Sequence, residues 1–253
     1  MSLHPNRFED FFQNQGYVAL KNHLYNYIVR KRAILSSVQI GNSATLETGS
    51  GMSPIVAPAE NVVYCDISFF ALKILKKAHN KCLFVVADST YLPFREDTFE
   101  NIICSEVLEH IEDDRKAVAE IARTLRPAGN VVVTFPHRQL YFSFDDRFVH
   151  HLRRYELNEM KVILEDSGFT IMKVDTALGL LEKIIMIPTT FLAMVFQFTK
   201  PAQRNVCTGI TSSPVFISFF RSLNRFLALL ARLDAAITPL RYATVLMIKA
   251  EKR

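Results

Sequence analysis

The chain has 253 residues, of which 49% are hydrophobic and 22% are charged. A chain of this length and apolar content can bury a sizeable core, which excludes an intrinsically disordered protein. Its formal net charge is +5, and residues 181–241 carry the whole surplus, as seven basic against two acidic side chains. Because the surplus is confined to one apolar segment, we expect an anionic surface or ligand there, and no nucleic-acid partner.

The cysteines and the N-terminus bear on the cellular compartment. The four cysteines form neither a CxxC pair nor a zinc-ligand spacing. Cys65, Cys82 and Cys104 fall in apolar runs and are expected to be buried, reduced thiols; the fourth is Cys207. The first residues contain no apolar secretory signal. We therefore expect a cytoplasmic protein, with a peripheral position on the inner membrane face as a further option.

Residues 1–43 are expected to form an N-terminal helical cap. Within them, residues 17–38 place apolar side chains at spacings of three and four, which is typical of an amphipathic helix. The same helix carries a basic cluster, Arg30-Lys31-Arg32, which is a candidate for the anionic surface.

From residue 44 onward, β-rich runs alternate with helix-like segments. The first five runs are residues 44–47, 61–65, 82–87, 101–104 and 130–135, and two more follow at 169–175 and 243–250. Helices are expected at 69–78, in a segment that ends at 125, and at 156–167. Pro127-Ala128-Gly129 is expected to separate the second of these helices from the next strand. This alternation predicts βαβ units and a parallel sheet.

The expected architecture is an α/β fold with a Rossmann-like, seven-stranded, mostly parallel sheet and helices on both faces. Its main domain would comprise residues 44–180 and 242–253. Residues 181–241 would form a helical insertion between the sixth and seventh strands.

Polar residues follow each of the first four expected strands. In an open parallel sheet, ligands bind beyond the carboxyl ends of the strands. Glycines at 49 and 51 let the backbone turn tightly and approach a ligand, and an acid at the second strand's end can accept hydrogen bonds from both hydroxyls of a ribose. The strand ends present Glu47-Thr48-Gly49-Ser50-Gly51, Asp66-Ile67, Asp88-Ser89 and Ser105-Glu106.

These residues together resemble the class I S-adenosylmethionine-dependent methyltransferases of the small-molecule type, similar to those of ubiquinone and menaquinone. The resemblance covers residues 44–175 and includes the acid-x-Gly-x-Gly motif and the segments 92–94, 97–99, 105–110 and 125–129. It implies S-adenosylmethionine as the cofactor. It also implies that the methionine part lies at Glu47, Gly49, Ser50 and Gly51, the ribose at Asp66 and Ile67, and the adenine at Asp88 and Ser89, with Ser105 and Glu106 beside them.

The glycine loop departs from this family at its exit, where the usual third glycine is Ser53, followed by Pro54. This departure leaves a non-catalytic relative open. It also disfavours a nicotinamide-dependent dehydrogenase, because Pro54 takes the place of the last glycine in that fingerprint and a third strand ending in Asp88 has no role there.

Methylation of a hydroxyl requires a group that removes its proton, and histidine is the usual base near neutral pH. His137 directly follows the fifth expected strand and should project near the substrate. His150, His151 and Tyr155 form a polar cluster before the helix at 156–167. These four residues are the catalytic candidates.

Glu106, Glu109 and His110 share one face if a helix has begun by Glu106. This Glu-x-x-Glu-His pattern resembles the metal site of small-RNA 2′-O-methyltransferases, where a later histidine completes the ligands, and the corresponding segment of ubiquinone O-methyltransferases. Because the same residue pattern is common in relatives that need no metal, we predict no metal and keep the three residues as weak candidates for metal ligands.

The insertion contains two apolar stretches. Residues 184–198 are almost wholly apolar but too short to span a bilayer. On a helix at about 100° per residue, residues 215–233 place Arg221, Arg225 and Arg232 on one side and a row of Phe and Leu on the other. Two interpretations stay open: an interfacial helix on an anionic membrane, or a lid whose apolar side packs on the domain.

The sequence therefore predicts an S-adenosylmethionine-dependent methyltransferase that acts on an apolar or lipid-linked small molecule, on oxygen rather than nitrogen or carbon. Two alternatives are kept: a metal-assisted RNA 2′-O-methyltransferase, and a non-catalytic, membrane-associated relative. The oligomeric state stays open.

Overall fold

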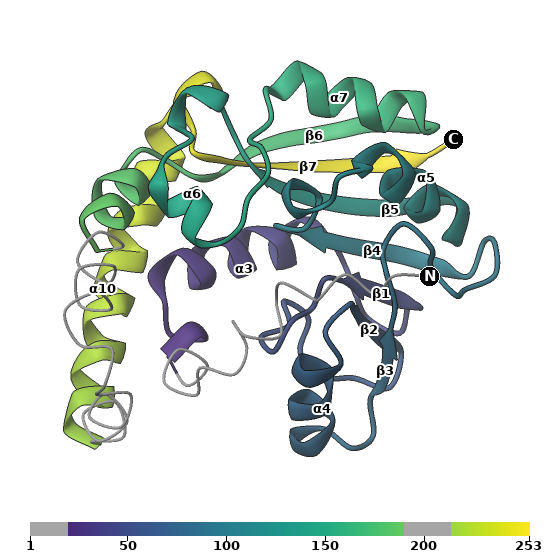
Figure 1. The fold of residues 1–253 in the computed structure, drawn as a ribbon, viewed down its shortest axis with the longest axis horizontal. Coiled ribbons are helices and arrows are strands. Elements are labelled where there is room, and N and C mark those ends of the chain that lie inside the picture. Colours follow the sequence, from purple (N-terminus) through teal and green to yellow (C-terminus); the bar gives the residue numbers. More distant parts are fainter. Residues whose placement is uncertain (1–19, 190–213) are drawn as a thin grey trace.

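A seven-stranded sheet forms the centre of the protein (Figure 1). The computed structural model describes residues 20–189 and 214–253. The strands lie in the order β3-β2-β1-β4-β5-β7-β6. Their bounds are β1 Thr45–Thr48, β2 Val62–Asp66, β3 Leu83–Val86, β4 Phe99–Ser105, β5 Leu125–Pro136, β6 Phe169–Leu178 and β7 Val245–Lys252.

Six strands run in one direction, and β7 is antiparallel to both of its neighbours. Thr48 pairs with Cys65 in β2 and with Cys104 in β4, so that these strands end together at one edge. Val245, at the start of β7, pairs with the last residues of β5 and β6 and so arrives at that same edge. The expected mostly parallel, Rossmann-like sheet is confirmed.

Helices cover both faces of the sheet. One apolar core lies under α5 (Asp114–Thr124) and α7 (Leu157–Asp166), and a second lies under α3, α4 and α10. The bounds of these last three helices are α3 Tyr25–Ser37, α4 Phe69–Ala78 and α10 Pro214–Ile237. Shorter elements are α6 Phe144–Phe148 and the 3₁₀ turns η1 Leu108–His110, η2 Gln139–Tyr141 and η3 Leu240–Tyr242.

The first crossover contains no helix. Residues 49–61, between β1 and β2, form turns and irregular backbone. Pro54 and Pro58 lack the amide hydrogens that a helix needs, which accounts for the absence of a helix here. Contacts from outside hold the segment instead: the carbonyl of Pro54 accepts hydrogen bonds from Tyr27 Oη at 2.8 Å and Lys31 Nζ at 2.9 Å.

The N-terminal helix is shorter than expected. The extended backbone of Leu24 starts α3 at Tyr25, and the part of the expected helix before residue 20 lies outside the described residues. The Tyr25 amide donates to Asn224 Oδ1 of α10 at 3.0 Å, which caps α3 from a distant part of the chain.

Two other boundaries show how local chemistry acts. As expected, α7 ends near Ser167, with Gly168 at a φ of 91° beyond it. The expected separator 127–129, in contrast, lies inside β5. The helix α5 ends at Thr124, β5 begins at Leu125, and residues 126–129 form an irregularity with Ala128 at a φ of 60°.

Cys65, Cys82 and Cys104 are free thiols; Cys65 and Cys104 are buried and Cys82 is half-buried. Cys207 and most of the apolar stretch 184–198 lie outside the described residues. Among the helices that the structure describes, none has the length and apolar content needed to cross a bilayer.

Candidate active site

Glu47 anchors the first crossover. The side chain is buried at the end of β1, and its two oxygens accept hydrogen bonds from the amides of Ile55 and Val56 at 2.6 and 2.9 Å. Burial raises the pKa of Glu47 to about 7, against the opposing effect of these bonds and of Lys31 and Lys21. Since the carboxylate binds the chain's own backbone, we assign Glu47 to positioning the loop that follows it.

The glycine loop turns through the left-handed region. Gly49 and Gly51 have φ values of 70° and 54°, which other residues rarely adopt. A Cβ atom on Gly49 would overlap the side chain of Val107, from the segment after β4. The loop therefore lies directly against residues 106–110, which carry the Glu-x-x-Glu-His pattern.

Asp66 lies at the end of β2 and binds the loop. Its two oxygens accept hydrogen bonds from the amides of Gly51 at 2.7 Å and Ser68 at 2.8 Å. Burial raises its pKa, and those two bonds act against the rise. Each carboxylate oxygen can accept a second hydrogen bond, so the expected contact with ribose hydroxyls is chemically open. Ile67, beside it, is 48% exposed.

The third strand ends in an exposed acid. Asp88 Oδ1 accepts hydrogen bonds from the amide and hydroxyl of Thr90 at 2.8 and 2.9 Å, which fixes the carboxylate at the rim. The neighbouring Ser89 hydroxyl lies 2.8 Å from Thr48 Oγ1 at the end of β1. Glu47, Asp66 and Asp88 thus stand at one edge of the sheet, as expected.

The fourth strand delivers Ser105 and Glu106 to the same edge. Ser105 Oγ lies 2.9 Å from Thr134 Oγ1 in β5. Glu106 adopts a φ of 54°, and one of its oxygens faces Arg30 Nη1 at 3.6 Å. Its other oxygen is buried and accepts no hydrogen bond. No helix has begun by Glu106, so the condition for a shared helical face with Glu109 and His110 is not met; residues 108–110 form the 3₁₀ turn η1.

Glu109, His110 and His151 form a cluster beside this edge. Their ligand atoms all lie within 4.8 Å of one another. The Nε2 atoms of His151 and His110 lie 3.7 and 4.0 Å from Glu109 Oε1. Glu109 is fully buried, neither of its oxygens accepts a hydrogen bond, and burial raises its pKa well above the ordinary value. These three residues have a donor set that suits a zinc-type ion, with His151 in place of the expected Glu106.

An ion network orients His151. Its Nδ1 lies 2.8 Å from Asp146 Oδ1, so the other ring nitrogen faces Glu109. Asp146 also binds Arg154 at 2.8 Å and Lys183 at 3.2 Å. Although burial opposes it, the hydrogen bonds from His151 and Arg154 hold the pKa of Asp146 well below its ordinary range.

The other catalytic candidates lie in different surroundings. His150 is exposed, and its carbonyl lies 3.2 Å from His110 Nδ1. His137 is buried, and its Nδ1 lies 3.0 Å from the carbonyl of Ala243. Tyr155 is fully buried and donates to Asp114 Oδ2 at 2.7 Å, and burial raises the pKa of its phenol further. The structure thus brings His151 to the cluster and places Tyr155 in the core.

Comparison with known proteins agrees with this geometry. Residues 46–133 match the family described as a methyltransferase domain. A demethylmenaquinone methyltransferase of Streptomyces griseus is 31% identical over 107 residues, which is 42% of this chain and 46% of that enzyme.

Two solved structures share the fold. An S-adenosylmethionine-dependent methyltransferase of Thermotoga maritima, described as a possible histamine N-methyltransferase, superimposes with a TM-score of 0.65 at 13% identity, over 97% of this chain and 98% of its own. A phosphoethanolamine N-methyltransferase of Haemonchus contortus, solved with S-adenosyl-L-methionine, has a TM-score of 0.61 at 18% identity, over 100% of this chain and 61% of its own.

Residues 46–133 match a methyltransferase domain, and the fold is that of class I S-adenosylmethionine-dependent methyltransferases. This confirms the expected family and its cofactor. The match spans less than half of the length of the Streptomyces griseus enzyme.

The methyltransferase domain has polar groups that fit this cofactor. The hydroxyl of Ser50 in the glycine loop is buried without a hydrogen-bond partner, as is one oxygen of Glu106 across the rim. Buried polar atoms without partners are costly, and a polar ligand between these elements would satisfy both. The carboxylates of Asp66 and Asp88, which follow the neighbouring strands β2 and β3, add acceptors for hydroxyl and amino groups at the same edge of the sheet.

Several residues of the methyltransferase site were not found from the sequence. Arg30, expected to lie on an anionic surface, instead faces Glu106 in the site, and Lys31 binds the first crossover. Lys21 is partly buried close to Asp66 and Glu47, and burial lowers its pKa to about 8. Asp146 and Lys183 pair across 37 positions. No local pattern reveals such pairs, because the fold alone brings them together.

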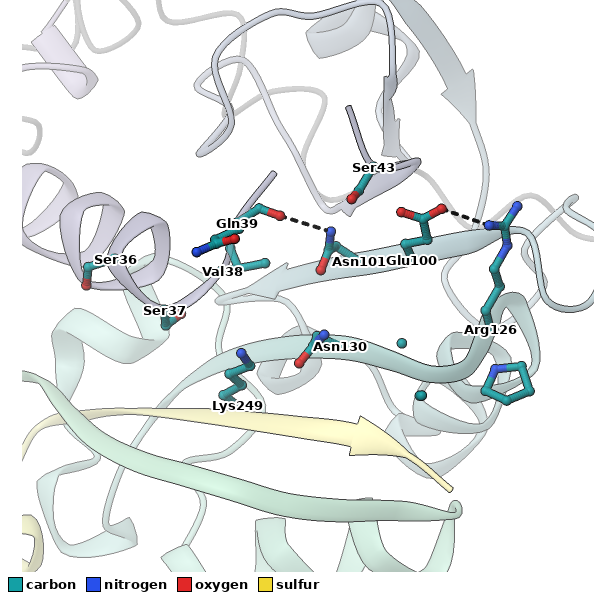
Figure 2. A pocket seen from close by; sticks show the side chains of 13 residues that line it. Ser36, Ser37, Val38, Gln39, Ser43, Glu100, Asn101, Arg126, Asn130 and Lys249 are labelled. Atoms are coloured by element: carbon teal, nitrogen blue, oxygen red, sulfur yellow. Dashed lines mark hydrogen bonds and ion pairs between the residues drawn. The ribbon is translucent and has the colours of Figure 1, made fainter. Parts of the chain in front are cut away.

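A cavity of about 530 Å³ lies at the opposite edge of the sheet (Figure 2). It is lined by Glu100 and Asn101 near the amino end of β4, by Asn130 of β5, which pairs with Asn101, and by Lys249 of β7. Glu100 pairs with Arg126 at 2.8 Å across its mouth. Because ligands of open α/β sheets bind at the carboxyl ends, this cavity is separate from the methyltransferase site.

Proposed function

We propose that the protein transfers a methyl group from S-adenosylmethionine to an oxygen atom of an apolar or lipid-linked small molecule. The observation that carries the proposal is the approach of Val107 to Gly49, which supports a place for the Glu109–His110–His151 cluster beside the expected cofactor rim. An acceptor hydroxyl needs its proton removed beside the methyl donor, and this cluster supplies the groups for that task.

When bound, S-adenosylmethionine supplies a methyl group on a positively charged sulfur, and its leaving group is neutral. The protein's main task is therefore to hold the acceptor oxygen in line, which can supply about 7–11 kcal/mol of the barrier reduction. Asp66, Asp88 and the glycine loop would hold the nucleoside and methionine parts. The ring of His151, fixed through Nδ1 by Asp146, would take the acceptor proton on Nε2.

The apolar character of the acceptor is inferred from the surroundings. Leu140 and Leu180 are 78% and 40% exposed near the carboxyl edge, and α10 adds further exposed apolar side chains. The similarity to demethylmenaquinone methyltransferases, whose name denotes a quinone substrate, supports the same substrate class.

Cofactor binding is the first test. We expect calorimetry to detect S-adenosylmethionine binding by the full chain. Asp66→Ala should weaken binding by about tenfold to a hundredfold, because hydrogen bonds to a charged group contribute about 1.5–3 kcal/mol. Asp166→Ala is the control, because Asp166 is an exposed acid at the end of α7, outside the expected cofactor rim. Absence of binding at millimolar cofactor would contradict the proposal.

The acceptor class is tested separately. A lipid extract is incubated with the protein and cofactor carrying a radiolabelled methyl group, then separated into organic and aqueous fractions. We expect label in the organic fraction, on a compound whose mass rises by one methyl group. Label confined to RNA or to the aqueous fraction would overturn the lipid-linked acceptor but not the methyl transfer.

A further inference from the structure

The helix α10 turns its apolar face away from the protein. Its most buried side chains are small or polar: Asn224, Ala228 and Ala231 lie in the contact with α3 and β6, and Leu227 packs partly buried beside them. Eight apolar side chains are exposed, from 37% at Leu230 to 80% at Ile237. They are Val215, Phe219, Leu223, Phe226, Leu229, Leu230, Leu233 and Ile237. At about 100° per residue they fall within an arc of about 120°.

Among the residues that the structure describes, this arrangement favours the interfacial helix over the lid. A lid would press Phe219 and Phe226 against the domain, but they are 64% and 57% exposed. A continuous apolar row of this kind is rare on a soluble monomer and marks an interaction site. The helix has 24 residues, so the row is about 36 Å long at 1.5 Å per residue.

Basic side chains run along one border of the apolar row. Arg221, Arg225 and Arg232 are all exposed and fall within about 40° of one another, between the inward face and the apolar row. The single acid of α10, Asp234, is turned inward and binds the amide of Leu181 at 2.9 Å. The outward surface of the helix is therefore apolar and positively charged, which complements an anionic lipid bilayer.

The position of α10 gives this surface a function. Figure 1 shows the helix beside α3, at the edge where the parallel strands end. From there the chain continues through η3 into β7, whose first residue pairs with the last residues of β5 and β6. A bilayer against α10 would therefore face the edge that holds the cofactor rim and the Glu109–His110–His151 cluster.

We propose that α10 is an interfacial helix that docks the protein on an anionic membrane, with Phe219, Phe226 and Leu233 among the acyl chains and the three arginines at the phosphates. The role as a route to a lipid-linked acceptor rests on the proposed function, but the docking itself does not. The helix lies in the surface and does not cross it.

Vesicle flotation of the full chain tests the proposal without cofactor. The vesicles are phosphatidylcholine alone, or an equimolar mixture with phosphatidylglycerol. We expect flotation with the anionic vesicles and weaker flotation as salt is raised, since ions screen surface charges. If the protein does not float with anionic vesicles, the proposal is overturned, whichever other partner the apolar face of α10 binds.

Two variants separate the apolar and the basic contributions. Phe219→Ser with Phe226→Ser removes two exposed rings, and Arg221→Gln, Arg225→Gln and Arg232→Gln together remove the charges. Each basic residue near an anionic surface contributes about fivefold in affinity, so the triple variant should bind roughly a hundredfold more weakly. The matched controls, Val162→Ser with Met172→Ser and Lys76→Gln with Lys77→Gln and Lys81→Gln, should float like the wild type.

Association between copies of the chain is the main competing use of the face. Sedimentation velocity without vesicles measures it: a dimer that Phe219→Ser with Phe226→Ser dissociates would overturn the membrane proposal. Calorimetry with S-adenosylmethionine distinguishes the two proposals, because the α10 variants should retain cofactor binding while losing flotation. If the protein floats with anionic vesicles but does not bind S-adenosylmethionine, the docking proposal stands and the proposed methyl transfer is rejected.

Discussion

At the scale of single residues, the orientation of His151 is the feature with the clearest chemical consequence. We expect His151→Asn to lower kcat by about 10²- to 10⁴-fold, the usual contribution of a general base, while the affinity for S-adenosylmethionine stays within twofold. Asp146→Asn should give a smaller loss, because the ring stays present while the charged acceptor that fixes its tautomer is replaced by a neutral amide, which can also donate. Steady-state methyl transfer and cofactor calorimetry measure the two quantities.

A substitution at the neighbouring His150 serves as a control, because it distinguishes loss of the catalytic base from a disturbance of the local fold. His150 is exposed and has a φ of 63°, which asparagine tolerates, so His150→Asn should retain most of the activity.

A chelator tests whether the reaction depends on a metal ion bound by the Glu109–His110–His151 cluster. We expect activity to survive chelation; loss of activity that zinc restores would make His151 a metal ligand and contradict its role as base.

Gly49 offers a residue-scale test of how the site is assembled. Gly49→Ala should lower the free energy of unfolding by about 1–3 kcal/mol, because alanine is strained at a φ of 70° and its Cβ would overlap Val107. Val107→Ala removes the overlap but leaves the backbone strain. In urea titrations, the double variant should therefore be less destabilised than the sum of the single changes. Simple additivity would show that the contact with Val107 is unimportant.

At the scale of elements, the first crossover is the part that depends most on one side chain. Glu47 has a pKa of about 7 when folded, raised from 4.5 mainly by burial, so the folded state holds its proton more tightly than the unfolded state. The sign follows: Glu47 lowers the free energy of unfolding as pH rises from about 4.5 to about 7, by about 3 kcal/mol at most.

Glu47→Gln removes this titration. We expect the stability difference, wild type minus variant, to fall across that pH window when both are followed by urea titration. The variant also loses one acceptor for the Ile55 and Val56 amides, so a constant offset is expected in addition. A difference that stays flat from pH 4.5 to 7 would show that Glu47 does not titrate there.

The same scale shows what the sequence can and cannot predict. Helix α4 was predicted to the residue, because its apolar period and Ser68 cap are local signals, and the seven strands were found from their β-rich runs. The shared helical face of Glu106, Glu109 and His110 required a helix to have begun by Glu106, and that condition is not met, because Glu106 has a left-handed backbone and residues 108–110 form a 3₁₀ turn. The Glu109–His151 approach joins segments 42 positions apart, so spacing alone could not supply it.

At the scale of the whole molecule, the amphipathic pattern of α10 was visible in the sequence but its direction was not. The period fixes which residues share a face, whereas the packing of Asn224, Ala228 and Ala231 on α3 decides which face is outward. Asn224 also caps α3 through Tyr25, so α10 is attached to the domain by a specific contact as well as by packing.

This attachment predicts that Asn224→Ala loosens α10 from α3. The change leaves the Tyr25 amide without its partner and should cost about 1–3 kcal/mol in the free energy of unfolding. Hydrogen exchange should rise at the first turn of α3 and along α10, while β1, β4 and β5 stay protected. Ser222→Ala, an exposed neighbour on the same helix, is the matched control. Equal exchange in both variants would show that packing alone holds the helix.

Docking and catalysis should be coupled through this geometry if the acceptor is lipid-linked. With the acceptor extract incorporated into anionic vesicles, we expect methyl transfer by the Arg221, Arg225 and Arg232 triple variant to fall in parallel with its flotation. Its cofactor affinity should match that of the wild type. When the same extract is presented in neutral detergent micelles, the wild type and the triple variant should transfer methyl groups equally fast, because binding to the micelle does not depend on attraction to a charged surface. A difference that persists in micelles would mean that the arginines act on the active site itself.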